Sequence, residues 1–336
     1  MLFPNTDIID FQNKINESQT ITLISHFNPD GDTIGAVSAL FHYFKLKNKT
    51  LKVLIPNEYP SFLEFVMKDV PHIIGSKQTD DAKLALSETD LIICLDFNSV
   101  KRVGDFLQEF LITSTKSKVL IDHHLEPEVE NFNLIFSNIQ VSSTCELLYE
   151  VLLLMENGNS FLNPNISESL YLGICTDTGS FSFSCNHRRT YEVVADLVDN
   201  GVDVEYVHQI VFNTYSENRL RLLGFCLSER LKVFPKHRAA FVYLSKNDLR
   251  RFNYQIGDCE GVVNFCLSMQ GIEFGALVTE RADRVRLSFR SKFDFDVNLF
   301  ARKYWNGGGH KKASGGYSFD KLELVIEQLT TQIETF

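Results

Sequence analysis

Residues 21–34 read ITLISHFNPDGDTI, an apolar run that gives way to a histidine and two aspartates. The β-branched and aliphatic residues at its start predict a strand. Apolar residues then recur at helical spacing, at Ile34, Val37, Leu40, Phe41 and Phe44. This spacing predicts a helix over 32–47. His26, Asp30 and Asp32 are therefore expected in the turn between a strand and the helix that follows it.

Acidic residues follow apolar runs at three further places in the first half of the chain. They are Asp96 after 91–95, the tripeptide Asp122-His123-His124 after 119–121, and Asp177 after 170–175. The runs 91–95 and 119–121 predict strands, as does 51–55, whereas 170–175 predicts the end of a helix. Strands that alternate with helices predict a parallel sheet with helices on both faces. Ligands of such sheets collect beyond the carboxyl ends of the strands, where these side chains fall.

Each of these residues also has a purely structural interpretation. Asp30 or Asp32 can cap the following helix, and Asp177 can sit in an ordinary turn. The joint pattern favours metal binding, because capping does not predict acidic residues after four apolar segments, two of which also carry histidines. Oxygen and imidazole ligands without thiolate suit manganese, magnesium or iron-like ions better than structural zinc. Manganese is the best single expectation.

Composition and charge restrict the class of protein. With 336 residues and 44% hydrophobic content, the chain can bury a large core and suits two domains better than one. A formal net charge of −10 argues against binding of long duplex nucleic acid. The seven cysteines include no CxxC pair, which predicts neither a disulfide framework nor a thiolate zinc site. We expect a cytoplasmic protein without a membrane segment, and a homodimer is compatible with the sequence.

The second half predicts a separate domain. Residues 190–229 have a charged helical pattern without a strand signal, as expected of a connector. Strands are predicted at 239–244, 273–279 and 285–289, and a helix at 296–304. The fold class is therefore α/β, with a parallel-sheet domain followed by a smaller α/β domain.

Two features of the second domain favour an anionic ligand. Residues 306–316 read NGGGHKKASGG, and consecutive glycine amides can form a concave phosphate site beside His310. Polar residues alternate with apolar ones upstream, at Arg284, Arg286, Ser288 and Arg290. This alternation places a basic face on one side of a strand. A flexible turn and a solvated edge strand are the structural alternatives.

The four acidic segments resemble the motifs of the DHH phosphoesterase superfamily, which is named for the tripeptide at 122–124. The resemblance implies that one metal ion is held by His26, Asp30 and Asp96. It implies that a second ion is held by Asp32, Asp96, His123 and Asp177, so that Asp96 bridges the two. It further implies catalytic roles for His124, which would face the substrate phosphate, and for Asp122, which would orient the histidines.

The glycine-rich region resembles the DHHA1 domain, and the two-domain form is similar to the nanoRNase/pAp phosphatase group. The resemblance implies a DHH domain at 1–189, a helical connector at 190–229 and a DHHA1 domain at 230–336, with a cleft between the domains. The substrate-binding candidates that it implies are Arg290, Ser291, Gly308, Gly309 and His310. Asn306 departs from the pattern, since a further glycine is common there. So do Phe97 and Asn98, where small residues are often found.

The expected activity is metal-dependent hydrolysis of short oligoribonucleotides to 5'-mononucleotides, and also of the 3'-phosphate of pAp. The alternatives are a phosphodiesterase for linear or cyclic dinucleotides, a single-strand exonuclease, and a nucleotide-binding regulator without turnover. Arg102 is expected either to reach the substrate phosphate or to pair with Asp105. Phe97 is a candidate for stacking a base.

Overall fold

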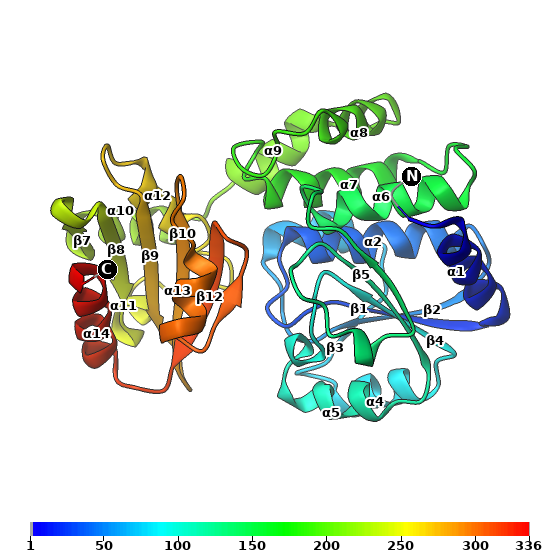
Figure 1. Ribbon diagram of the computed structural model, residues 1–336, viewed down its shortest axis with the longest axis horizontal. Helices are drawn as coiled ribbons and strands as arrows, with labels where there is room; N and C mark the ends of the chain where they lie inside the picture. Colours follow the sequence, from blue (N-terminus) through cyan, green and yellow to red (C-terminus); the bar gives the residue numbers. More distant parts are fainter. Residues whose placement is uncertain (1–2, 336) are drawn as a thin grey trace. The chain divides into compact units, whose positions relative to one another are not determined.

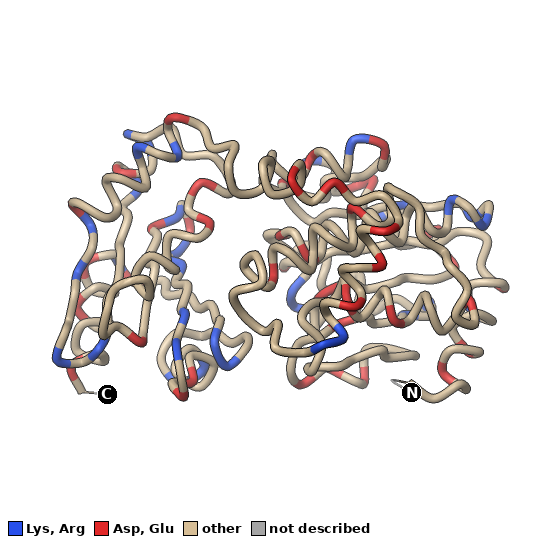
Figure 2. The backbone as a smooth tube through the Cα atoms, turned by 90° about the horizontal axis from the view of Figure 1, so that it is seen from above, with Lys and Arg blue, Asp and Glu red and all other residues tan. Residues whose placement is uncertain are grey.

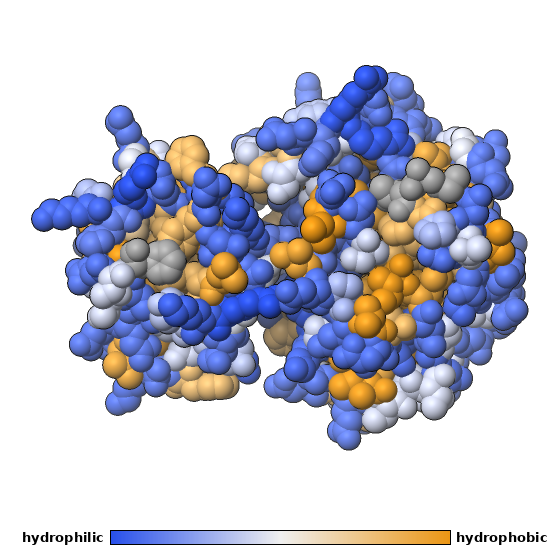
Figure 3. Space-filling model, in the orientation of Figure 1, coloured by the Kyte–Doolittle hydropathy of each residue, from blue (hydrophilic) through white to orange (hydrophobic). Residues whose placement is uncertain are grey.

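The computed structural model describes residues 3–335 and divides into two compact units, an N-terminal unit at 1–214 and a C-terminal unit at 215–336. Both units combine a sheet with helices on its two faces (Figure 1). Acidic and basic residues are interspersed along both units (Figure 2). The face drawn in Figure 3 is largely hydrophilic, with apolar side chains in small groups. The α/β fold class predicted from the sequence is confirmed.

The N-terminal unit contains a six-stranded parallel sheet in the order β3-β2-β1-β4-β5-β6. Its strands are β1 (Thr20–Ile24), β2 (Thr50–Ile55), β3 (Ile73–Ile74), β4 (Leu91–Leu95), β5 (Ser117–Asp122) and β6 (Leu134–Ser137). The four strands predicted from the apolar runs are present at their expected positions. Because β1, β4 and β5 are neighbours and run in the same direction, their carboxyl ends meet at one edge of the sheet.

Helices cover both faces of this sheet (Figure 1). The helices of the unit are α1 (Asn5–Glu17), α2 (Gly31–Lys45), α3 (Glu64–Met67), α4 (Thr79–Ser87), α5 (Asp105–Thr113), α6 (Thr144–Met155), α7 (Pro164–Asp177), α8 (Arg188–Asp199) and α9 (Val204–Phe212). One core packs α1, α2, α6 and α7 against the sheet, and a second core packs α4 and α5 against the opposite face. Phe97 is fully buried in the second core. The expectation that Phe97 stacks a base is therefore wrong, because its ring is enclosed by apolar side chains.

Helices α2 and α7 approach each other closely through glycines. A Cβ atom at Gly35 would lie 2.4 Å from the Ser169 carbonyl oxygen, and one at Gly31 would lie 2.3 Å from Thr176 Oγ1. A Cβ atom at Gly173 would lie 2.7 Å from Asp32 Oδ1. Only glycine permits this backbone approach. This contact brings Asp32, near the start of α2, close to the end of α7, where Asp177 is the last residue.

The C-terminal unit contains a mixed six-stranded sheet in the order β11-β12-β10-β9-β8-β7, in which only the β8–β9 pair is parallel among the described strands. Its strands are β7 (Leu231–Phe234), β8 (Ala239–Leu244), β9 (Phe274–Glu280), β10 (Val285–Ser291), β11 (Gly308–Gly309) and β12 (Ala313–Ser318). The helices are α10 (Glu217–Glu229), α11 (Lys246–Arg251), α12 (Val262–Ser268), α13 (Val297–Tyr304) and α14 (Leu322–Thr335). Helices α13 and α14 pack on one face, and α10, α11 and α12 pack on the other.

The segment 190–229 is helical, as predicted, and the described residues there form no strand. Helices α8 and α9 belong to the N-terminal unit, whereas α10 belongs to the C-terminal unit. Across residues 3–335, every helix is too short or too polar to span a membrane.

Candidate metal centre

The side chains predicted as metal ligands converge at the edge of the N-terminal sheet where β1, β4 and β5 end. Asp96 directly follows β4, and its amide donates to the Ile121 carbonyl of β5 at 3.0 Å. Its backbone has a positive φ of 66°, which Asp adopts more readily than most residues. This conformation turns the buried Asp96 carboxylate toward the histidines that follow β1 and β5.

The first cluster contains His26, Asp30 and Asp96. The Nε2 atom of His26 lies 3.7 Å from Asp30 Oδ1 and 3.5 Å from Asp96 Oδ2. The other ring nitrogen, Nδ1, lies 3.0 Å from the Phe27 carbonyl oxygen and donates to it. The lone pair of the neutral ring is therefore on Nε2, which is buried and has no hydrogen-bond partner within residues 3–335. A bare nitrogen lone pair that faces two carboxylates suits a cation between them.

The ionisation of this cluster leads to the same conclusion. Burial alone would lower the pKa of His26, but its contacts with Asp30 and Asp96 raise that pKa to about 9. Partial burial would raise the pKa of Asp30, but its contact with His26 lowers it. A protonated His26 ring thus supplies the positive charge beside the two carboxylates that a metal ion would otherwise supply.

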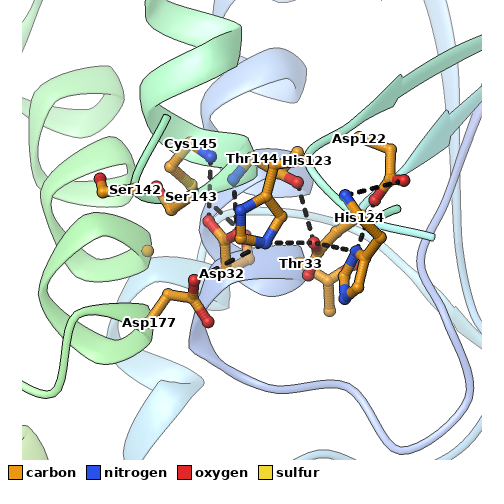
Figure 4. Close-up of polar contacts among 12 residues, drawn as sticks. Asp32, Thr33, Asp122, His123, His124, Ser142, Ser143, Thr144, Cys145 and Asp177 are labelled. Carbon is orange, nitrogen blue, oxygen red and sulfur yellow. Dashed lines mark hydrogen bonds and ion pairs between the residues drawn. The ribbon is translucent and has the colours of Figure 1, made fainter. Parts of the chain in front are cut away.

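The second cluster surrounds His123 (Figure 4). Its Nε2 atom lies 3.8 Å from Asp32 Oδ2, 3.7 Å from Asp96 Oδ1 and 3.6 Å from Asp177 Oδ2. Ligand atoms that each lie about 2.0–2.2 Å from one divalent ion are roughly 3 to 3.6 Å apart, close to this spacing. Asp96 therefore presents Oδ2 to the first cluster and Oδ1 to the second. The donor set fits two neighbouring divalent cations that share one carboxylate.

Charge repulsion within the second cluster is strong. Burial raises the pKa of Asp32 well above its usual value, and the nearby carboxylates of Asp96 and Asp177 raise it further. Burial and the neighbouring His124 lower the pKa of His123, which favours the neutral imidazole that binds metals. A bound cation would relieve the repulsion among the carboxylates.

The first turn of α6 holds two of the carboxylates in place. The amides of Thr144 and Cys145 donate to Asp32 Oδ2 and Oδ1 at 2.7 and 2.9 Å, and the Thr144 hydroxyl donates to Asp96 Oδ1 at 2.8 Å. These contacts were not predicted from the sequence. The sequence feature that could have indicated them is the three-residue spacing of Ser143 and Glu146, which is typical of a helix start. The Glu146 amide donates to the Ser143 hydroxyl at 3.0 Å.

Asp122 fixes the orientation of His124. Its carboxylate is fully buried and lies 2.6 Å from His124 Nδ1, while the His124 amide donates to its other oxygen at 3.1 Å. His124 Nδ1 is also 3.7 Å from Asp96 Oδ1. The Asp122 contact leaves the Nε2 edge of the ring, rather than Nδ1, for other partners. The catalytic roles of both residues stay predictions.

Arg102 lies beside the first cluster, in a 3₁₀ turn over Val100–Val103. Its carbonyl accepts from the Phe27 amide at 2.6 Å, and its positive charge helps to lower the pKa of Asp30. In the part of the chain that the structure describes, Arg102 forms no ion pair with Asp105. That Arg102 reaches the substrate phosphate stays a prediction.

The predicted substrate-binding residues of the C-terminal unit lie on β10, on β11 and, for His310, directly after β11. Half-buried Arg290 donates from Nη1 to the Phe289 carbonyl at 3.0 Å, and the Ser291 hydroxyl donates to the Phe295 carbonyl at 2.7 Å. Gly308 and Gly309 form β11 and pair with β12, and the amide of His310 donates to the Ala313 carbonyl at 2.8 Å. The assignment of these residues to substrate binding stays a prediction.

The glycines have a structural role that the sequence did not reveal. A Cβ atom at Gly307 would lie 2.0 Å from the Gly315 carbonyl oxygen, and one at Gly309 would lie 2.7 Å from the Ala313 carbonyl oxygen. Gly309 also has a φ of 144°. The run forms a strand packed tightly against β12, which differs from the open turn considered above.

Comparison with known proteins supports the resemblance. Residues 20–174 match the DHH family, N-terminal domain. An exopolyphosphatase-related protein from Bacteroides fragilis has a crystal structure that is similar over 99% of this chain and 96% of its own, with 33% sequence identity and a TM-score of 0.91. The chain belongs to the DHH family.

Other relatives of this DHH protein differ in their named activities. The bifunctional oligoribonuclease and PAP phosphatase NrnA of Bacillus subtilis is 28% identical over 93% of this chain and 94% of its own length. The cyclic-di-AMP phosphodiesterase GdpP of the same species is 25% identical over 96% of this chain, which spans 48% of GdpP. The structure of RecJ from Thermus thermophilus in complex with Mn²⁺ is similar in fold, with a TM-score of 0.59 and 12% identity, over all of this chain and 55% of RecJ.

Proposed function

We propose that this protein is a metal-dependent phosphoesterase that hydrolyses short single-stranded oligoribonucleotides to 5'-mononucleotides and also removes the 3'-phosphate of pAp. The proposal is supported by near full-length similarity to the bifunctional oligoribonuclease and PAP phosphatase of Bacillus subtilis. The observation that carries it is the pair of ligand clusters joined by Asp96, whose Oδ2 faces His26 and whose Oδ1 faces His123.

Two divalent ions, manganese before magnesium, would occupy these clusters. His26, Asp30 and Asp96 would hold one ion, and Asp32, Asp96, His123 and Asp177 would hold the other. The set of oxygen and imidazole donors, without thiolate, supports these ions. When bound, such ions lower the pKa of water and neutralise charge on a phosphoryl group.

The residues of the chain itself supply position and hydrogen bonds. His124, held by the carboxylate of Asp122, would donate to the substrate phosphate or to the leaving oxygen. Arg102 would add positive charge on the side of the first cluster. In the C-terminal unit, which we assign to the DHHA1 type, Arg290, Gly308, Gly309 and His310 would bind the nucleotide. Ser291 fits this role less well, since its hydroxyl already donates a hydrogen bond to the Phe295 carbonyl.

A cyclic or linear dinucleotide phosphodiesterase is the second candidate function. It is supported by the similarity to GdpP, but the chain spans only 48% of GdpP, compared with 94% of NrnA. A single-strand exonuclease has weaker support, since the likeness to RecJ concerns the fold alone. A regulator without turnover would not need a complete set of metal ligands.

A substrate panel tests the proposal. The purified protein would be incubated with Mn²⁺ and with RNA of two to five nucleotides, pAp, cyclic-di-AMP or pyrophosphate, and the products would be separated by chromatography. We expect mononucleotides from the short RNAs and AMP from pAp, with much slower turnover of the other two. Preferential release from cyclic-di-AMP would favour the second candidate, and binding without release would support a regulator.

A further inference from the structure

Three arginines, Arg281, Arg284 and Arg286, gather at the hairpin that joins β9 to β10; Arg284 and Arg286 belong to the basic face described above, but none of the three has been assigned to substrate binding. The hairpin closes through the Arg281 amide, which donates to the Arg284 carbonyl at 2.8 Å. Arg286 follows on β10, whose side chains are buried at every second position. The buried residues pack in the core beneath α13 and α14, so Arg286, Ser288 and Arg290 share the opposite face.

Aromatic rings lie among these arginines. The Arg281 guanidinium carbon is 4.4 Å from the centroid of the Tyr254 ring, and its Nη2 donates to the Tyr254 hydroxyl at 2.9 Å. The Arg284 guanidinium carbon is 5.1 Å from the Tyr317 ring and 5.5 Å from the Phe319 ring. Tyr317 is also the partner of Arg286 in the β10–β12 register. We call these six residues the hairpin patch; they are Arg281, Arg284, Arg286, Tyr254, Tyr317 and Phe319.

The positive charge of the hairpin patch is mostly unneutralised. Asp283 pairs with Arg284 at 2.6 Å, but within residues 3–335 neither Arg281 nor Arg286 forms an ion pair with a carboxylate. Arg281 Nε is buried and lacks a hydrogen-bond partner in the described part of the chain. Partial desolvation and the charges of Arg281 and Arg284 lower the pKa of Arg286. Three arginines that share one carboxylate, Asp283, leave a local excess of positive charge in a protein with a net charge of −10, and this excess suits an anionic ligand.

The mixture of cations and rings indicates the chemistry of that ligand. Guanidinium groups bind phosphates through parallel hydrogen bonds, and aromatic rings stack nucleobases. Phe319 is 72% exposed, which leaves its ring accessible to a base. Four residues along β10 separate Arg286 from Arg290, a distance of about 13 Å in a strand. A dinucleotide has a single internal phosphodiester, so a strand held at Arg290 needs further nucleotides to reach the hairpin patch.

We propose that the hairpin patch is a subsite for the additional phosphates and bases of oligonucleotides longer than two residues. Arg281 and Arg286 contact phosphate oxygens, and Phe319 stacks a base. The subsite gives longer substrates a higher affinity than dinucleotides. This inference rests on the proposed function, since it concerns how the same oligonucleotide substrates are held.

The test measures binding of the full-length protein to fluorescein-labelled RNA of two and of five nucleotides by fluorescence polarisation, with a chelator present so that no turnover occurs. For the double variant Arg281→Ala/Arg286→Ala, we expect affinity for the five-nucleotide RNA to fall about tenfold or more. Affinity for the dinucleotide should change less than about twofold. The dependence of log Kd on log salt should become shallower by about 1.4, since each single-strand phosphate contact contributes about 0.7.

Two further variants separate charge from stacking. Phe319→Ala should weaken binding of the longer RNA with no change in the salt dependence. Lys236→Ala is the matched control, because it removes an exposed positive charge near the β7–β8 edge of the same sheet. It should leave both affinities unchanged. The thermal unfolding midpoint of each variant, compared with that of the wild type, confirms that the fold is retained.

The outcomes are distinguishable from failure of the proposed function. If the wild type hydrolyses dinucleotides but binds two and five nucleotides equally well, or if the double variant weakens both equally, the subsite is overturned and the proposed function stands. If an acidic peptide displaces the five-nucleotide RNA as effectively as unlabelled RNA does, charge alone acts at the patch and the nucleotide subsite is overturned. A wild type that releases nothing from any oligonucleotide refutes the proposed function, and the subsite with it.

Discussion

The two sheets of this protein concentrate opposite charges by different means. In the N-terminal unit, parallel strands end together and bring the buried candidate ligands Asp32, Asp96 and His123 to one edge. In the C-terminal unit, an antiparallel strand spreads Arg286 and Arg290 along one face, where they are exposed or half-buried. The first arrangement suits a small cation that several strands surround. The second would suit an extended anion that runs along a strand, so the two sheets present their charges in different arrangements.

The largest effect is expected from a variant that disrupts the predicted metal centre of the N-terminal unit. Asp96→Asn should lower kcat about 1000-fold or more and reduce bound manganese, because one carboxylate faces both clusters. Asn tolerates the positive φ at this position, so the fold should persist. Metal content by mass spectrometry and initial rates on a dinucleotide are the measurements. The control Asp105→Asn removes an exposed carboxylate at the start of α5 and should leave both unchanged. Full activity in Asp96→Asn would refute the bridging assignment.

Raising the pH should strengthen metal binding. In the metal-free protein the pKa of His26 is about 9, above its ordinary value of 6.5, so the ring is protonated at neutral pH and a metal ion must displace that proton. The stabilisation from this protonated ring is fully present below pH 6.5 and disappears as pH rises through 9. Metal affinity should therefore increase about tenfold per pH unit between pH 7 and 9 for each displaced proton. Calorimetric titrations with Mn²⁺ in two buffers of different ionisation enthalpy measure both the affinity and the protons released. An affinity independent of pH would contradict the assignment of His26.

Changing the spacing of the ligands should have an intermediate effect. In Gly173→Ala, the new methyl group would lie 2.2 Å from Cys145 Sγ and 2.7 Å from Asp32 Oδ1, so α7 or Asp32 must move. We expect a loss of about 1–3 kcal/mol in the free energy of unfolding, together with weaker metal binding. Gly224→Ala is the matched control, since a Cβ atom there has no neighbour within 4 Å in α10. It should be neutral or stabilising by up to about 1 kcal/mol. Urea denaturation of both variants measures the change in the free energy of unfolding, and metal titration measures the change in metal binding.

The smallest effect is expected from a variant that changes only the predicted substrate-binding residues of the C-terminal unit. His310→Ala should raise KM for a dinucleotide about tenfold, the approximate cost of one hydrogen bond to a charged group. Bound manganese should stay near the wild-type amount, because His310 is assigned to the substrate. Together with Asp96→Asn, this variant separates the two functions of the molecule. Loss of metal in His310→Ala would show that the division between the units is wrong.

The positions of the ligands could be predicted from sequence because sheet geometry determines them. Each of Asp96, His123 and the turn at His26 follows an apolar run, and neighbouring parallel strands necessarily end at one edge. The helix ending at Asp177 was predicted in the same way, and α7 ends there. Local sequence patterns were sufficient to predict these positions, because the positions depend only on where each strand or helix ends.

The remaining features depend on contacts between segments that are distant in sequence. Thr144 donates to Asp96, 48 residues away, and the sequence near Thr144 indicates only the start of a helix. Phe97 follows the same strand as Asp96, but the packing of α4 and α5 decides that its ring is buried. The glycines at 307–309 were interpreted from the sequence as a phosphate site or a flexible turn, and the sequence could not show that β12 packs against them.

The glycine contact between α2 and α7 has a consequence for how the protein tolerates change. A Cβ atom at Gly35 would lie 2.4 Å from the Ser169 carbonyl oxygen and 3.1 Å from the Gly173 nitrogen, so the backbones of α2 and α7 are in direct contact beside Asp32. We expect substitutions that repack the surrounding aliphatic core to change the separation of the Asp32 and Asp177 carboxylates less than substitutions of these glycines would. The predicted metal affinity should then respond more strongly to changes at the helix contact than to changes elsewhere in the core.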